Sequence, residues 1–98
     1  MKPDKLTIKS QEALSQSRHI AEHHEHQQIE PEHVLLALAT QADGIVKDIL
    51  KKVGVDPQIV ARRLEEVLRA FPKVSGAGEV YISPRTQKML DNALREAQ

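Results

Sequence analysis

The chain has 98 residues, balances fourteen lysines and arginines against fourteen aspartates and glutamates, and contains no cysteine. This length fits one small domain, and the balanced charge without a long run of either sign argues against a nucleic-acid-binding surface. The lack of cysteine excludes disulfides, thiolate metal sites and a cysteine nucleophile. Because no stretch approaches the roughly 18 apolar residues of a membrane span and the N-terminus lacks an apolar signal core, we expect a cytoplasmic protein without membrane contact.

Prolines mark the starts of three predicted helices. Each follows an acidic or hydroxyl residue, in the pairs Glu30-Pro31, Asp56-Pro57 and Ser83-Pro84. Proline fits the first helical position because its missing N–H would have no partner there, and the preceding side chain can accept from the free N–H groups of the first turn.

Three further residues are predicted to mark the other helix ends. Thr7 and Asp43 can act as N-caps, and Gly54 follows two lysines as expected at a helix C-terminus. Apolar residues recur at three- and four-residue spacing within each segment, which predicts an all-α fold, a small helical bundle of about five helices without strands. The predicted helices span 8–24, 31–41, 44–53, 57–70 and 84–98.

The polar segment 72–82 contains two nearby glycines and is predicted as a linker. The segments before and after this linker are partly similar to each other. When the first predicted helix is aligned with the last, Thr7 corresponds to Ser83 and apolar residues recur at the same spacing in both helices. The predicted organisation is one complete four-helix repeat over 1–71, the linker, and the first helix of a second repeat over 83–98.

Histidines are concentrated in the first third of the chain. His19 and His23 lie four residues apart, with His26 close by, and a pair at this spacing can present two imidazoles to one zinc ion. On a helix these three lie opposite the apolar stripe, whereas His24 lies nearer to it and is expected to be a hydrogen-bonded structural histidine. We therefore expect a solvated face with no metal and no cofactor. A histidine-based metal-binding or phosphotransfer module is the alternative.

Three stretches of the sequence resemble the N-terminal domain of the bacterial Clp ATPases. They are Leu6-Thr7, the ten residues 29–38 (IEPEHVLLAL), and 81–85 (YISPR). The acid-Pro-Glu-His form of the second stretch is most similar to the ClpB disaggregase branch. The resemblance implies a mobile, eight-helix domain that captures unfolded or aggregated polypeptides for the ATPase modules of the parent chain. The sequence lacks the glycine-rich phosphate loop of such modules, so we expect no enzymatic activity.

The same resemblance implies which residues bind polypeptides. Leu6 and Thr7 open the first helix, and Glu32 occupies a position that in the ClpC branch resembles a phosphoarginine-binding acid. A carboxylate at Glu32 can pair with a guanidinium, or it can simply offset the helix dipole. Leu90 and Leu94 lie on the apolar stripe of the last helix, beside the groove between the repeats. This stripe can either dock on the first bundle or support self-association, and of these we expect a two-fold homodimer.

Overall fold

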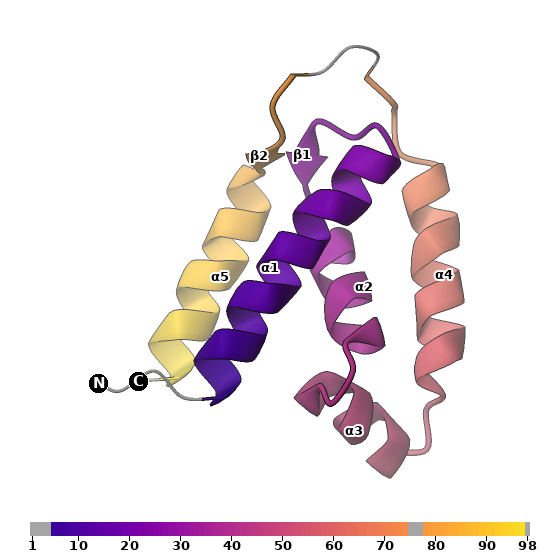
Figure 1. Ribbon diagram of the computed structural model, residues 1–98, viewed down its shortest axis with the longest axis vertical. Coiled ribbons are helices and arrows are strands. Elements are labelled where there is room, and N and C mark those ends of the chain that lie inside the picture. The colour runs from indigo at the N-terminus through magenta and orange to yellow at the C-terminus, as the bar shows by residue number, and fades with distance from the viewer. Residues whose placement is uncertain (1–4, 75–77, 98) are drawn as a thin grey trace.

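The computed structural model describes residues 5–74 and 78–97, and within them it confirms the predicted all-α fold (Figure 1). The chain forms α1 (Lys5–His23), β1 (Gln28–Ile29), α2 (Pro31–Thr40), α3 (Ile45–Lys52), α4 (Pro57–Arg69), β2 (Tyr81–Ile82) and α5 (Pro84–Ala97). None of the described helices is both long and apolar enough to cross a bilayer.

Helix α2 is the centre of the bundle. It is apolar on most of its circumference, as expected for a helix covered on several sides, and α1, α3, α4 and α5 all contact it. Figure 1 shows α4 and α5 on opposite sides of this helix. Its buried side chains are those of His33, Val34, Leu36, Ala37 and Ala39.

Small residues form the buried face of α1. Ala13, Ser17 and Ala21 are spaced by four residues and are at most 3% exposed. Short side chains allow neighbouring helix axes to approach closely. Ser17 remains satisfied in this environment because its hydroxyl donates to the Ala13 carbonyl at 2.6 Å.

One core cluster connects the last helix to the rest of the bundle. Ala21, Ile29 and Val34 form its buried centre, and Met89 of α5 packs against it together with Val80 from the preceding segment. Helix α5 therefore docks on the first bundle, the alternative to the homodimer expected for its apolar stripe.

The prediction that the chain contains no strands was wrong. β1 and β2 pair in parallel, with Gln28 opposite Tyr81 and Ile29 opposite Ile82. The segment 72–82, predicted as a plain linker, therefore ends in a strand. Two-residue strands are too short to produce an alternating hydrophobic pattern, so the sequence carried no signal for them.

Two predicted N-caps were also wrong. Helix α1 is already helical at Lys5, so Thr7 lies inside its first turn. Helix α3 begins after Gly44, which occupies the N-cap position, whereas Asp43 adopts a left-handed conformation with φ of +56°. A Cβ on Gly44 would lie 3.1 Å from the Gln41 carbonyl oxygen, and this close approach explains why the turn selects glycine.

Gly54 confirms the predicted end of α3. Its φ is +82°, and its N–H donates to the Lys51 carbonyl at 3.1 Å while the next N–H, of Val55, donates to Leu50 at 2.8 Å. This hydrogen-bond pair is the Schellman arrangement, in which a left-handed residue closes the last helical turn.

Helix α1 ends in the same way but without a glycine. Glu25 has φ of +59°, its N–H donates to Glu22 at 3.1 Å, and the N–H of His26 donates to Ala21 at 2.9 Å. The left-handed conformation is unfavourable for a residue with a Cβ. The turn nevertheless redirects the chain so that His26 becomes buried, at 4% exposure, beneath the end of α1.

We therefore predict that Glu25→Gly raises the free energy of unfolding by about 0.5–1 kcal/mol, because relief of the left-handed strain outweighs the added freedom of the unfolded chain. Gly54→Ala is the matched control and should lower stability by about 1 kcal/mol. Urea unfolding of both variants at pH 7.5 measures the difference. A less stable Glu25→Gly protein would contradict the strain argument.

Candidate functional site at the start of α2

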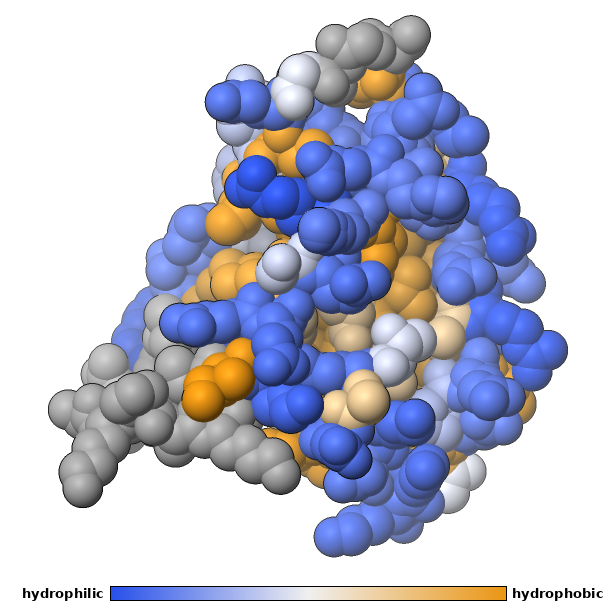
Figure 2. Space-filling view, in the orientation of Figure 1, coloured by the Kyte–Doolittle hydropathy of each residue, from blue (hydrophilic) through white to orange (hydrophobic). Residues whose placement is uncertain are grey.

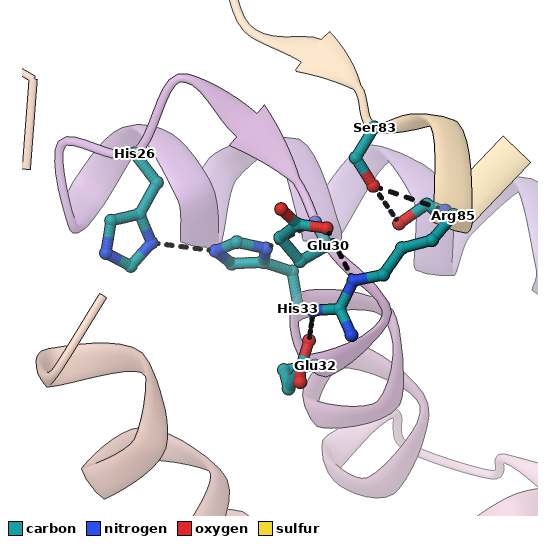
Figure 3. A network of polar contacts seen from close by, with 7 residues as sticks. His26, Glu30, Glu32, His33, Ser83 and Arg85 are labelled. Carbon is teal, nitrogen blue, oxygen red and sulfur yellow. Dashed lines mark hydrogen bonds and ion pairs between the residues drawn. The ribbon is translucent and has the colours of Figure 1, made fainter. Parts of the chain in front are cut away.

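The start of α2 is joined to the start of α5 by the two short strands. The N–H of Tyr81 donates to the Gln27 carbonyl at 2.9 Å, and the N–H of Ser83 donates to the Ile29 carbonyl at 3.2 Å. Both strands run directly into a proline-initiated helix, so the polar side chains of the two first turns come together, as Figure 3 shows.

Arg85 of α5 links the carboxylates of Glu30, the N-cap of α2, and Glu32 in the first turn of that helix. Its Nε lies 3.2 Å from Glu30 Oε1, and its Nη2 lies 2.8 Å from Glu32 Oε1. The hydrogen bond to Glu30 raises the pKa of Arg85, with further support from the charge of Glu32, so the guanidinium stays charged. Because Arg85 is more than half exposed, these contacts orient α5 more than they stabilise it. Glu32 is thus able to pair with a guanidinium, and here that guanidinium belongs to the chain itself.

Ser83 caps α5 from a buried position. Its hydroxyl oxygen accepts from the N–H of Thr86 at 3.2 Å, and its O–H donates to the Thr86 hydroxyl at 2.8 Å. Both side chains are at most 2% exposed. The N-cap predicted at Ser83 is confirmed, as is the one at Asp56, whose carboxylate accepts from the N–H of Gln58 at 2.9 Å.

A chain of hydrogen bonds passes through two buried histidines on the other side of α2's N-terminus. The N–H of Glu30 donates to Nδ1 of His33 at 2.7 Å, and Nε2 of His33 lies 2.9 Å from Nδ1 of His26. Since a backbone N–H can only donate, Nδ1 of His33 is an acceptor and its Nε2 carries the hydrogen. That hydrogen is donated to His26, whose own hydrogen is therefore also on Nε2.

The surroundings of both rings favour the neutral form. Burial lowers the pKa of His33 to about 4, with His26 as the second cause, and burial followed by the charge of His24 lowers the pKa of His26. Phe71 packs beside both rings, with ring centroids 5.5 Å from His26 and 6.2 Å from His33. Nε2 of His26 is buried without a hydrogen-bond partner among the described residues.

The prediction that the histidines form a solvated face is therefore correct only in part. His19 and His23 are exposed, as expected. His24 is half-buried, but within the described part of the chain its contacts are with the rings of its neighbours and not the expected hydrogen bond. His26 lies in the interior because the turn at Glu25 takes it off the helix. His19 and His23 border a cleft of about 420 Å³ between α1 and α4, and Leu36 lies in its lining. The metal-binding alternative grouped His26 with these two residues, whereas its ring is bonded to His33 instead.

The predicted polypeptide-binding residues fall in two places. Glu32 lies in the junction, and Leu90 is half-buried on α5. Leu6 and Thr7 belong to α1 and Leu94 to α5, but their side chains lie outside the described part of the structure. His33 and Arg85 were not predicted. A signal for His33 was present, because it stands three residues after the N-cap, where a side chain can reach back to the N-cap N–H.

The fold and this junction define a small helical domain in which two proline-initiated helices are held side by side. The chain belongs to the Clp repeat family, because the model of the Clp repeat (R) N-terminal domain matches residues 5–98.

Curated relatives agree with this assignment. The chain is 40% identical to chaperone protein ClpB 2 of Nostoc sp. over 93% of its own length, and 38% identical to ClpB of Bdellovibrio bacteriovorus over 95%. It is 36% identical to ClpB of Porphyromonas gingivalis over 95%. It spans only 10–11% of the length of these proteins. The matched relatives are chaperones, and the metal-binding or phosphotransfer alternative receives no support from them.

We predict that Ser83→Ala lowers the free energy of unfolding by about 1–2 kcal/mol, because it removes the cap of α5 and leaves the buried hydroxyl and N–H of Thr86 without their partner. Ser15→Ala, at an exposed position of α1, is the control and should change stability by less than about 0.5 kcal/mol. Equal effects in thermal or urea unfolding would show that the Ser83 cap contributes nothing specific.

Proposed function

We propose that this chain is a polypeptide-binding module of a ClpB-type chaperone, which captures unfolded or aggregated proteins in the cytoplasm for the ATPase modules of its parent chain. The observation that carries the proposal is the family match over residues 5–98 together with relatives that are ClpB chaperones. The module acts by binding and carries no chemistry of its own.

The surface provides the apolar contacts that such binding requires. Many aliphatic side chains are 40% exposed or more, and Figure 2 shows apolar residues among the hydrophilic ones, including an apolar area between α1 and α4. Contiguous exposed apolar area typically marks interaction sites, whereas single exposed aliphatic side chains are common on any protein surface. The side chains concerned are Ile8, Leu35, Ile45, Ile49, Val53, Ile59 and Val67.

Within this proposal, the binding surface contains the predicted residues Leu6, Thr7, Glu32, Leu90 and Leu94. Leu90 supplies apolar contact from α5. Glu32 pairs with arginine side chains of the bound polypeptide, and because Arg85 already occupies this carboxylate at 2.8 Å, Arg85 competes with them. Weakly held, solvent-exposed ion pairs exchange partners at little cost in free energy, which suits a module that releases what it captures.

We predict that the purified chain hydrolyses ATP no faster than the buffer does, because the sequence contains no phosphate-binding glycine loop. A coupled phosphate-release assay measures this. A rate above background that disappears when one residue of this chain is substituted would contradict the non-catalytic proposal.

We predict that Leu90→Glu weakens binding of a permanently unfolded, fluorescently labelled model protein at least fivefold, because it places a charge in the apolar contact. Asn92→Glu introduces the same charge at an exposed position of the same helix and should leave affinity within twofold. Fluorescence anisotropy measures the affinities, and circular dichroism checks that both variants fold. Absence of binding by the native chain would refute the proposed function.

A second comparison locates the surface and tests the possible homodimer. Ile49 on α3 is 52% exposed, so Ile49→Glu tests an apolar position remote in sequence from α5. If Ile49→Glu and not Leu90→Glu weakens binding, the function stands but the surface lies on α3.

Sedimentation of the native chain and Leu90→Glu over a wide concentration range shows whether α5 also mediates self-association. Monomers throughout would exclude the dimer.

A further inference from the structure

The two buried histidines have no free site for a proton. Nδ1 of His33 accepts from the N–H of Glu30 at 2.7 Å, and Nδ1 of His26 accepts from Nε2 of His33 at 2.9 Å. In the neutral pair both Nε2 atoms already carry hydrogens, so the two Nδ1 lone pairs are the only positions at which a proton can add. Each of them is engaged in a hydrogen bond, and protonation of either ring therefore breaks the chain.

These hydrogen bonds hold the chain segment that forms β1. The segment between the two histidines, residues 26–33, contains β1 and the first turn of α2, and its two ends are fixed to each other through the imidazole rings. β1 in turn holds β2, through the N–H groups of Tyr81 and Ser83. The segment before β2 depends on the same region, because the N–H of Val74 donates to the Glu25 carbonyl at 2.8 Å.

Charged groups from several elements act on the pair. Glu30 and Glu32 in the first turn of α2 favour a protonated ring, whereas His24 at the end of α1 disfavours it, as does Lys73, which follows α4, for His26. Both glutamates are already paired with Arg85 of α5. The uncharged ring of Phe71 covers the remaining side. Burial is the largest influence, and it opposes protonation.

We propose that His26 and His33 form a proton-operated latch, which opens in mildly acidic conditions and releases the β1–β2 pairing and α5 from helices α1–α4 while these four helices stay folded. The latch is a property of the domain's conformation and does not depend on the proposed polypeptide binding.

The pH window follows from the two states of the latch. His33 has a pKa of about 4 when closed, and a solvated histidine titrates near 6.5. As the pH falls, the open state therefore binds the proton before the closed state does. The free energy that favours the closed state is greatest above pH 6.5 and decreases as the pH falls toward 4. For one such site the opening equilibrium at pH 5 is on the order of 30-fold larger than at neutral or higher pH.

Hydrogen exchange tests the latch at individual amides. Protection factors at Tyr81 and Ser83, whose N–H groups bond across the junction, should fall by on the order of 30-fold between pH 7.5 and pH 5. Protection at Leu36 and Ala37, inside α2, should change much less. If all four amides lose protection together at every pH, the domain unfolds as one unit and the latch does not exist.

His33→Gln separates protonation from hydrogen bonding. A glutamine at the third helical position can accept from the Glu30 N–H through its oxygen and donate to His26 through its nitrogen, but it cannot titrate. In this variant only His26 can still take up a proton, so the acid-induced fall in protection at Tyr81 and Ser83 should be much smaller than in the native chain. His19→Gln, at an exposed position, is the matched control and should behave as the native chain. An acid response that persists unchanged in His33→Gln would overturn the proposal.

The native chain alone provides a second test, which remains valid if His33→Gln fails to fold. Nitrogen NMR of the histidine rings at pH 7.5 should find both rings with the hydrogen on Nε2. The signal of His33 should stay in the neutral form well below pH 6 in the closed state. A hydrogen on Nδ1 of either ring, or titration of His33 near 6.5 with Tyr81 still protected, would contradict the latch.

Discussion

The free N–H groups at the start of α2 impose the constraint on which this domain depends. A helix begins with N–H groups that have no partner inside the helix, and here they lie beside the buried ring of His33. The carboxylate of Glu30 pairs with Arg85, and the N–H of Glu30 donates to Nδ1 of the buried His33, three residues later. That single requirement fixes the tautomer of His33, and through it the tautomer and position of His26.

The position of His26 in turn explains the strained end of α1. For the ring to reach His33 at 2.9 Å, the chain must turn back directly after the helix, and it does so through the left-handed conformation of Glu25. The strain of such a residue persists only where surrounding contacts determine the backbone. Burial of His26 between Phe71 and His33 supplies those contacts.

Three kinds of interaction attach α5 to the first four helices, and they differ in strength. The ion pairs of Arg85 are exposed and contribute little free energy, although they set the direction in which the helix leaves the junction. The buried hydrogen bonds of the Ser83 side chain and the backbone hydrogen bonds of the β1–β2 pairing are worth about 1 kcal/mol each. Met89 adds apolar burial against the core. Because most of these contacts meet at the start of α2, the segments predicted as separate repeats are coupled there.

The sequence alone determined the helices and the family of this protein. Proline after a capping residue fixes a helix start through local chemistry, which is why the starts at Pro31, Pro57 and Pro84 were correctly predicted. Gly54 marked a helix end for the same local reason. The apolar spacing predicted the helices themselves, but it did not determine burial, because Ile49 and Val67 of the apolar stripes are exposed. The stretches that resemble Clp N-terminal domains indicate the family without the tertiary structure.

Only the tertiary structure decided how the junction is built. Three contacts build it: the parallel pairing of β1 with β2, the Arg85 ion pairs and the His26–His33 hydrogen bond. The first two join residues that are distant along the chain, and the third depends on an unexpected turn. For this reason no periodic pattern in the sequence predicts them. His26 illustrates the reason. Extending the helix past His23 places its ring in solvent, whereas one left-handed residue, Glu25, reverses that direction and buries it. Local propensity sets where helices form, and long-range packing sets what their ends touch.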